Sequence, residues 1–464
     1  MTVGTLPDGF AVRLHDDVQV GSFLTSGARV VRLSAAARQV LNERAFTVTS
    51  PVTSRLAGRL LDLDLADPVL TGVPGPGLAA VTVVVPVRDN ADGVERLLKS
   101  LATSVTCIVV DDASGDPAAL AAVVRQYGAR LIRLEENVGP AAARNAGLRE
   151  VRSPFVAFVD SDVDVAVAAL SSLLGHLVDP AVALVAPRVR SQGGGRWLGR
   201  YEEVAGSLDL GGRAATIRTS SSVGYVPSAC LVARVAALGS GFDVDMRSGE
   251  DVDLVWRVDA AGYRVRYAAE IVVRHDARTS TRAWLARKAF YGTSAAPLAA
   301  RHGDRVAPAV LSPATALAVA ALVCQRRWSL AVAGVSVVAA VRTGPSLPPD
   351  LPHRARVELA RSAGAGAVRQ STSLVLRHWS PATLALCLVS RRARRAATFL
   401  AVADGLLAHR RAGTDLDVVH FVLARRGEDL AYGFGVWWGA ARARSVRCLT
   451  PRWVRSSPQQ ERRS

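Results

Sequence analysis

A regular alternation of apolar strands and helices between residues 81 and 159 is the feature that most constrains the fold of this chain. Residues 81–87 (VTVVVPV) are too uniformly apolar for an exposed edge strand, so they predict the first buried strand of a parallel sheet. Strands are also predicted at 107–110, 129–134 and 155–159, with helices at 92–102, 117–127 and 141–151 between them. This is the doubly wound α/β pattern, whose ligands bind beyond the carboxyl ends of the strands.

Residues 1–72 predict a small α+β module with two or three strands and two short helices. Alternating apolar positions indicate strands at 11–14 and 29–33. Ser34 and Ser50 are each placed to cap a short helix. We therefore expect this module to form a separate domain that precedes the sheet in the sequence.

The composition changes again after the predicted sheet domain, which spans residues 78–303 and follows a glycine- and proline-rich linker. Residues 306–324 and 330–341 are almost uncharged and apolar, and a basic turn separates them. Each segment is near or below the roughly 20 residues that span a bilayer. Two alternatives fit, a helical hairpin in or on a membrane or a pair of core helices. Residues 304–464 are predicted to form a helical, arginine-rich region.

The net charge of +17 comes almost entirely from arginine, because Lys99 and Lys288 are the only lysines among 57 basic residues. Such an excess suits nucleic acid, anionic lipid or phosphorylated ligands. The arginines are frequent from about residue 285 onward, and no basic stretch interleaved with aromatic residues indicates single-strand binding. We therefore predict a membrane surface, at its cytoplasmic face, and no nucleic acid partner. The scattered cysteines and the lack of a signal peptide agree with a reducing compartment.

Pairs of acidic residues stand at three places around the predicted sheet. For any one pair, a turn or a helix cap is the ordinary alternative. Carboxylates clustered at strand ends are costly unless a cation or a donor-rich ligand compensates them, so three such places together predict a binding site. The pairs are Asp111 and Asp112 after the second strand, Asp160 and Asp162 after the fourth, and Glu250 and Asp251 before a helix expected near residue 252.

The triplet Asp160-Ser161-Asp162 has a geometry that suits a metal ion. Alternate residues just after a strand turn two carboxylates toward the same side. Oxygen ligands of this kind suit Mg²⁺ or Mn²⁺, which keep waters and bridge substrate phosphates. A metal that neutralises a diphosphate is therefore expected here.

The order and content of these segments resemble the family 2 glycosyltransferases of the GT-A fold, from about residue 81 to residue 303. A single DxD triplet is a weak signal, whereas five segments in the family's order are a strong one. The resemblance implies a Rossmann-like, mostly parallel sheet and a metal-dependent, inverting transfer from a nucleotide-sugar donor. The five segments are VVVPVRDN at 83–90, VDDAS at 110–114, NVGPAAARNAG at 137–147, DSD at 160–162 and GEDVDL at 249–254.

The resemblance also implies roles for single residues of the donor site. Pro86 and Asp89 would border the base pocket, and Asp111 would accept a hydrogen bond from the nucleobase, with Asp112 beside it. Arg144 would approach the phosphate or ribose side of the donor. These residues all belong to the first three segments.

The remaining roles concern the sugar, the metal and the acceptor. Asn145 would lie beside Arg144, and Asp160 would face the ribose or the sugar. Asp162 would hold Mg²⁺ or Mn²⁺, with His275 either a further ligand or an ordinary packed or surface residue. Asp251, or alternatively Glu250, would be the general base that deprotonates the acceptor hydroxyl.

Segment 287–298 and the N-terminal module resemble more narrowly the glycosyltransferases of the mycofactocin system. This resemblance implies transfer of glucose from UDP-glucose to mycofactocin or its peptide-derived precursor. The first 70 residues distantly resemble small peptide-binding domains, and either an acceptor-holding role or a stabilising role fits them. Alternative functions are transfer to a polyprenyl phosphate or cell-wall glycan, a non-catalytic nucleotide-sugar-binding module, and a nucleotidyltransferase.

Overall fold

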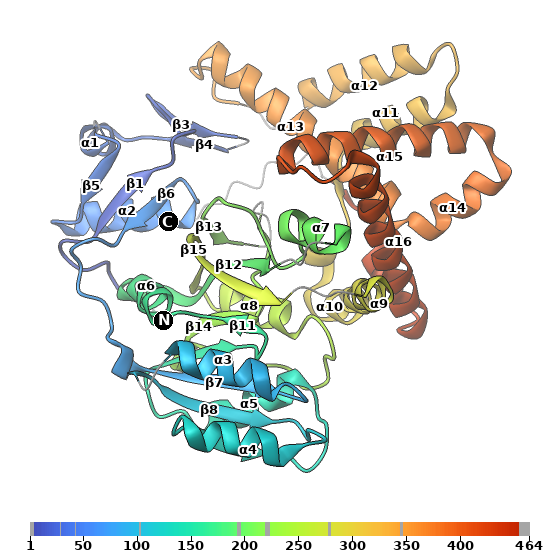
Figure 1. Ribbon diagram of the computed structural model, residues 1–464. Coiled ribbons are helices and arrows are strands. Elements are labelled where there is room, and N and C mark those ends of the chain that lie inside the picture. The colour runs from blue at the N-terminus through green and yellow to red at the C-terminus, as the bar shows by residue number, and fades with distance from the viewer. Residues whose placement is uncertain are drawn as a thin grey trace. The chain divides into compact units, whose positions relative to one another are not determined.

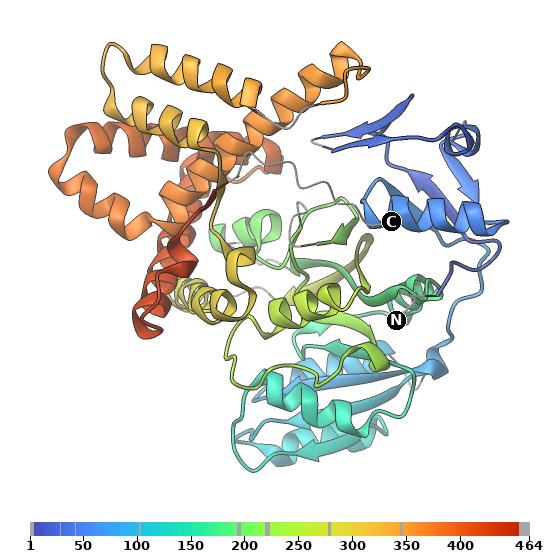
Figure 2. The same cartoon turned by 180° about the vertical axis from the view of Figure 1, so that it is seen from behind.

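The computed structural model of the protein describes residues 4–27, 29–41, 43–101, 104–192, 196–218, 223–276, 280–343 and 347–453. The chain divides into two compact units, which Figures 1 and 2 show from opposite sides. The sheet unit contains Met1–Val18 and Ser34–Thr279, and the helical unit contains Gln19–Leu33 and Ser280–Ser464. Residues 1–72 are thus divided between the two units, with residues 19–33 in the helical unit.

The sheet unit is built on a nine-stranded mixed sheet with the order β11-β15-β12-β14-β10-β7-β8-β9, and β13 pairs with β15. The predicted strands are confirmed, and β10, β7, β8 and β9 run parallel to one another. Strand β14 runs antiparallel between β10 and β12. The strands are β7 (Val81–Val87), β8 (Thr106–Asp111), β9 (Arg130–Arg133), β10 (Phe155–Val159), β11 (Val163–Asp164), β12 (Val182–Gln192), β13 (Ala215–Ile217), β14 (Cys230–Arg234) and β15 (Arg264–Asp276).

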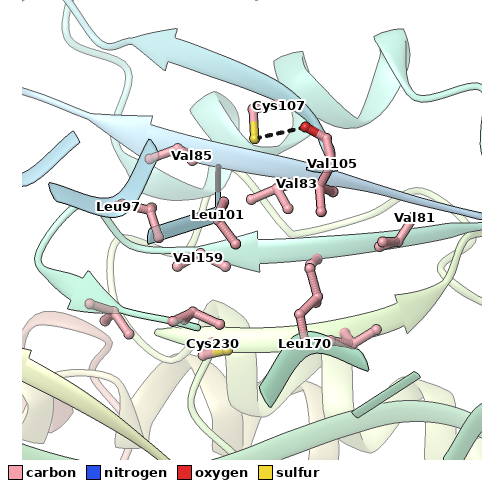
Figure 3. Close-up of a cluster of buried hydrophobic side chains, with 14 of the residues drawn as sticks. Val81, Val83, Val85, Leu97, Leu101, Val105, Cys107, Val159, Leu170 and Cys230 are labelled. Atoms are coloured by element: carbon pink, nitrogen blue, oxygen red, sulfur yellow. Dashed lines mark hydrogen bonds between the residues drawn. The ribbon is translucent and has the colours of Figure 1, made fainter. Parts of the chain in front are cut away.

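Helices cover both faces of the parallel part of the sheet. Figure 3 shows one face, where side chains of β7, β10 and β14 meet Leu97 and Leu101 of α3 in a buried apolar core. On the other face, Gly147 of α5 lies against Val84, and a Cβ there would come within 2.4 Å of the valine. The helices of this unit are α3 (Ala91–Leu101), α4 (Pro117–Gln126), α5 (Pro140–Glu150), α6 (Val167–Gly175), α7 (Trp197–Ala205) and α8 (Glu250–Ala260).

Residues before the sheet add a small antiparallel sheet of β5, β1 and β6 to the same unit. The predicted capping residues are confirmed, because Ser34 accepts from the amide of Ala37 and Ser50 forms a capping box with Thr53. The elements are β1 (Ala11–Leu14), α1 (Ala35–Val40), β5 (Ala45–Thr47), α2 (Pro51–Asp62) and β6 (Ala66–Val69).

Ion pairs explain why these residues belong with the sheet. The buried guanidinium of Arg264, at the start of β15, pairs with Asp62 at 3.0 Å and also with Asp179. Arg266, only 1% exposed, pairs with Asp67 at 2.7 Å. Because buried charges must be compensated, these two partly exposed N-terminal carboxylates tie the segment to the buried arginines of the sheet unit.

In the helical unit, β2 (Gln19–Val20), β3 (Phe23–Ser26) and β4 (Arg29–Arg32) form an antiparallel sheet. Phe23 packs in a buried cluster with Leu351, Ala355 and Leu359, which accounts for the assignment of residues 19–33 to this unit. The remaining elements are α9 (Thr281–Gly292), α10 (Ala295–His302), β16 (Val310–Leu311), α11 (Pro313–Cys324), α12 (Ser329–Thr343), α13 (His353–Ser373), α14 (Ser380–Val389), α15 (Arg391–Ala412), α16 (Val418–Arg442) and β17 (Arg452–Trp453).

The two predicted apolar helices form an adjacent pair, but the first is shorter than expected. Within residues 306–324 the α-helix begins only at Pro313, which follows the capping side chain of Ser312. Val310 and Leu311 instead pair with Arg452 and Trp453 in a parallel two-stranded sheet. Within the part of the chain that the structure describes, no helix combines the length and the apolar character needed to cross a bilayer.

Candidate active site

The candidate site lies where the parallel strands end at one edge of the sheet. Val87, the last residue of β7, is in register with Asp111, the last residue of β8. Asp160 follows directly on β10, whose Phe158 is in register with Val84. The topology therefore brings the first two predicted acidic pairs to the same edge.

Asp111 is a fully buried carboxylate with unused acceptor capacity. Its Oδ1 accepts a hydrogen bond of 2.8 Å from the amide of Ser114. Its Oδ2 lies 3.9 Å from Nη1 of Arg133 and accepts no hydrogen bond from the described residues. Buried polar atoms normally have a partner, so this oxygen fits a donor group supplied by a ligand.

Asp89 joins the loops that follow β7 and β8. It has a left-handed backbone with φ 54°, which is uncommon for a non-glycine residue. Its amide donates to Oγ of Ser114 at 3.0 Å, and its Oδ1 accepts from the amide of Gly115 at 2.7 Å. Pro86 lies half-buried near the end of β7. Both residues thus lie near Asp111, Pro86 in register with Val110 and Asp89 through Ser114.

Asp112 serves the backbone of the loop that leads into α5. Its two carboxylate oxygens accept from the amides of Val138 at 2.8 Å and Gly139 at 2.9 Å. Gly139 has φ 88°, a conformation that favours glycine. The structure therefore places Asp112, beside Asp111, as an anchor of this loop.

Arg144 is the centre of the site. Its guanidinium, buried within α5, donates from Nη2 to Asp160 at 2.6 Å and from Nη1 to Glu250 at 3.1 Å. The ring of Phe242 lies 5.3 Å from its guanidinium carbon, a distance suited to a cation–π contact. One side chain of α5 thus links the end of β10 to the start of α8.

The charges around Arg144 shift the pKa values of the neighbouring acids. Burial opposes the charged form of Arg144, but Asp160, Glu250 and Asp251 outweigh burial and raise its pKa, so it remains a cation. Burial, with a contribution from Asp251, raises the pKa of Glu250 to about 7. Burial also raises the pKa of Asp251. A carboxylate that titrates near neutral pH is suited to take up a proton.

Glu250 and Asp251 are the first two residues of α8, not the residues before it as the sequence suggested. The helix starts two residues early because Gly249 adopts the left-handed conformation, with φ 81°, at its N-cap. Oδ1 of Asp251 accepts from the amide of Val252 at 2.8 Å and Oδ2 from the amide of Ser228 at 3.3 Å. The helix N-terminus, whose dipole favours anions, therefore orients the predicted base.

Asn145 uses its side-chain amide to hold the backbone of Phe242. Its Nδ2 donates to the carbonyl of Phe242 at 2.7 Å, and its Oδ1 accepts from the amide of the same residue at 2.9 Å. Both functions of the amide are thus used by one backbone segment. Because Phe242 stacks on Arg144, Asn145 positions the arginine indirectly.

The turn after β10 is held tightly against the start of α3. Nδ2 of Asn90 donates to Oγ of Ser161 at 3.1 Å. A Cβ on Gly93 would come within 2.2 Å of the carbonyl oxygen of Ser161. This close approach requires glycine at position 93 and fixes the turn that carries Asp160 and Asp162.

The predicted metal ligands lie close together, Asp162 just before β11 and His275 near the end of β15. Oδ2 of Asp162 lies 3.2 Å from Nε2 of His275, and Val163 is in register with His275 where β11 pairs with β15. Among the described residues, no three His, Cys, Asp or Glu side chains gather closely enough to hold a metal. One or two protein ligands fit a Mg²⁺ or Mn²⁺ ion that is completed by waters and substrate phosphates.

Three contributors to the site were not predicted as such from the sequence, namely Ser114, Phe242 and the amide of Ser228. Ser114 lies in the quoted segment VDDAS, so its place after the two aspartates was a usable signal. Phe242 and Ser228 reach the site from other parts of the chain. No spacing in the sequence indicates those contacts.

Comparison with known proteins identifies the family to which this chain belongs. The family model described as "Glycosyl transferase family 2" matches residues 82–240. "Pre-mycofactocin glycosyltransferase" of Mycobacterium tuberculosis, in strains CDC 1551 and H37Rv, is 42% identical over 97% of this chain and 99% of that protein. The chain belongs to glycosyltransferase family 2. Its α/β fold class with a GT-A sheet, predicted from the five segments, is thereby confirmed, as is its class of enzyme.

Other proteins similar to this family 2 glycosyltransferase match it over less of the chain. "Succinoglycan biosynthesis protein ExoU" of Rhizobium meliloti is 26% identical and covers 47% of the chain and 69% of its own length. A mannosyltransferase from Pyrobaculum calidifontis, solved with GDP-Man and Mn²⁺, has a TM-score of 0.38 and 20% identity. That alignment covers 72% of this chain and 88% of the other.

Proposed function

We propose that this family 2 glycosyltransferase transfers glucose from UDP-glucose to the precursor of mycofactocin, with inversion at the anomeric carbon. The observation that carries the acceptor is the 42% identity, over almost the whole of both chains, to a protein named pre-mycofactocin glycosyltransferase. UDP-glucose and inversion are what the resemblance to the mycofactocin group and to family 2 implies.

Donor binding is assigned to the edge of the sheet. Oδ2 of Asp111 accepts a hydrogen bond from the nucleobase, because it is a buried acceptor that lacks a hydrogen bond from the described residues. Asp89 and Pro86 border the base, and the Arg144–Asp160 pair presents its carboxylate to the ribose or sugar. A Mg²⁺ or Mn²⁺ ion held by Asp162 and His275 would neutralise charge on the diphosphate as it departs.

Proton transfer is assigned to Asp251. As the acceptor oxygen bonds to the anomeric carbon, its proton passes to the Asp251 carboxylate, and the bond from the anomeric carbon to the UDP oxygen breaks. Glu250 is the weaker candidate, since its Oε1 is already paired with Arg144. The raised pKa of Asp251 supports this assignment, because a stronger base takes the proton more readily.

Location at the cytoplasmic face of the cell membrane is part of the proposal. It is supported by the arginine-rich sequence after residue 285 and by the apolar surface of α11 and α12. Fractionation of cells that express the full chain tests it. Recovery of all the protein in the fraction free of membranes, at low ionic strength, contradicts it.

The reaction is tested with purified protein, UDP-glucose, Mn²⁺ or Mg²⁺ and separate acceptors. UDP release and product mass are followed with pre-mycofactocin, with a polyprenyl phosphate and with no acceptor. We expect a glucose-sized mass increase of pre-mycofactocin and a β-linkage by nuclear magnetic resonance. Turnover with the polyprenyl phosphate alone would assign the acceptor otherwise, and donor binding without any turnover would indicate a binding module.

A further inference from the structure

Two helical turns of the helical unit lie side by side. One is the turn at residues 325–328, between α11 and α12, and the other is Ser390, between α14 and α15. Nε2 of Gln325 in the first turn donates to the carbonyl of Arg392 at the second, at 2.7 Å. Figures 1 and 2 show both turns at the same end of the helical unit. We call residues 322–330 and 386–395 the paired tips.

The paired tips expose large apolar side chains to an unusual degree. Leu388 and Val389 at the end of α14 are each 83% exposed, and Leu330 at the start of α12 is 78% exposed. Single exposed apolar residues are ordinary, but a group of them at one end of a unit marks an interaction surface. Leu322, Trp328 and Leu386 in the same tips are each about half exposed.

The same tips are strongly basic. Residues 313–343 and 380–403 contain no Asp or Glu. The exposed arginines of the tips are Arg326, Arg327, Arg391, Arg392, Arg394 and Arg395. Nη1 of Arg394 donates to the carbonyl of Cys387, which keeps one of these cations beside the apolar end of α14. The surface thus combines exposed apolar side chains with positively charged arginines.

We propose that the paired tips dock the enzyme on an anionic lipid surface. Leu330, Leu388 and Val389 enter the boundary between headgroups and acyl chains, and the arginines contact the lipid phosphates. Trp328 suits the same boundary, where tryptophan is enriched. The inference rests on the proposed location at the cytoplasmic face and not on the proposed reaction.

Charge favours a lipid surface over a second copy of this chain. A symmetric dimer through this surface would bring the same six arginines of each copy together, without acidic residues from the tips to pair with them. The cytoplasmic leaflet instead carries anionic lipids that attract arginine. A bilayer surface can also bind apolar side chains that stand apart from one another, since it needs no complementary pocket.

Co-sedimentation of the full chain with vesicles tests this proposal without donor or acceptor. We expect binding to vesicles that contain phosphatidylglycerol, weak binding to pure phosphatidylcholine, and release by salt. The double variant Arg391→Gln, Arg392→Gln should bind about 25-fold more weakly, at about fivefold for each arginine near the membrane surface. Arg410→Gln with Arg411→Gln, two exposed arginines at the opposite end of α15, is the matched control and should bind as the unmodified chain does.

The apolar contribution is tested by Leu388→Ser with Val389→Ser. These side chains are exposed, so the variant should fold normally and lose most vesicle binding. Val357→Ser with Val368→Ser, exposed valines of α13 outside the tips, should retain it. No binding by the unmodified chain, an equal loss in the controls, or a chain dimer that Leu388→Ser with Val389→Ser dissociates would each overturn the proposal. Failure here leaves turnover on a soluble acceptor unaffected, and failure of turnover leaves vesicle binding unaffected.

Discussion

The guanidinium of Arg144 donates to the carboxylate of Glu250 at 3.1 Å, within the buried part of the site. This pair ties the first residue of α8 to α5. It also engages Glu250 with a cation, whereas the carboxylate of Asp251 accepts hydrogen bonds from the backbone amides of Val252 and Ser228. The two neighbouring acids therefore have different environments, and the proposed mechanism gives them different roles.

Replacing Asp251 with Asn should remove the proton acceptor and leave the donor pocket intact. We expect kcat to fall by about 10²- to 10⁴-fold, the usual contribution of a general base. The affinity for UDP, measured by calorimetry, should stay unchanged. Full activity in Asp251→Asn would assign the base to another residue, and Glu250→Gln is the variant that examines the alternative.

The activity should depend on pH through the pair of acids at the start of α8. Because the pKa of Glu250 is raised to about 7, the pair holds a proton below that pH, and kcat/KM should rise as pH increases through about 7. In Glu250→Gln the neighbouring negative charge is gone, so the rise should move to lower pH. A profile that is flat from about pH 5 to 9, measured under kcat/KM conditions, would contradict this linkage.

Replacing Asp162 with Asn should weaken metal binding at the turn after β10. Removing even an indirect partner of a metal ligand costs about 10- to 100-fold in affinity, so we expect a loss at least in this range. Titration of Mn²⁺ in the presence of UDP, followed by electron paramagnetic resonance, measures it. Asp164→Asn, two residues farther along and paired with Arg96 at 4.0 Å, is the control and should bind Mn²⁺ normally.

Replacing Asn145 with Ala should lower the stability of the protein. It should also disturb the position of Arg144, because Asn145 holds the Phe242 that stacks on it. Loss of the two hydrogen bonds leaves the amide and carbonyl of Phe242 without their partner, which costs about 1–3 kcal/mol in the free energy of unfolding. Denaturant unfolding measures this cost, and Asn137→Ala at an exposed position is the control. A loss of UDP affinity without loss of stability would instead indicate a direct donor contact.

Replacing Gly93 with Ala should displace the turn that carries the aspartate triplet. The added Cβ would lie within 2.2 Å of the carbonyl oxygen of Ser161, an overlap that costs about 1–3 kcal/mol. We expect a lower Tm and a higher Mn²⁺ requirement for turnover. Gly77→Ala is the matched control, because a Cβ at that position would meet no heavy atom within 4 Å. Unchanged Mn²⁺ dependence in Gly93→Ala would show that the turn tolerates the shift.

The parallel half of the sheet was predictable because its strands are uniformly apolar and its helices alternate with them. The edge that gathers Asp111 and Asp160 followed from that topology. The prediction for residues 306–324 was wrong at its start, since apolar composition alone did not distinguish the strand Val310–Leu311 from a helix. The Ser312-Pro313 pair marked the true helix start.

The roles of individual polar side chains were less predictable. The sequence places Asn145 next to Arg144, but the partner of Asn145, Phe242, is 97 residues away. Asp112 similarly uses both oxygens to accept from amides of another loop. Such contacts depend on which loops lie side by side in the folded chain. A single sequence does not indicate this.

The pairing of Arg264 with Asp62, and of Arg266 with Asp67, has a consequence for how this enzyme can be divided. Both arginines begin the same strand that ends near His275, so the N-terminal carboxylates neutralise one end of β15 and the proposed metal site uses the other. A truncation at residue 72 would leave the buried Arg266 without Asp67 and would leave Arg264 with Asp179 in place of two carboxylates. We therefore expect a chain that begins after residue 72 to be less stable, because the buried Arg266 would need another anion.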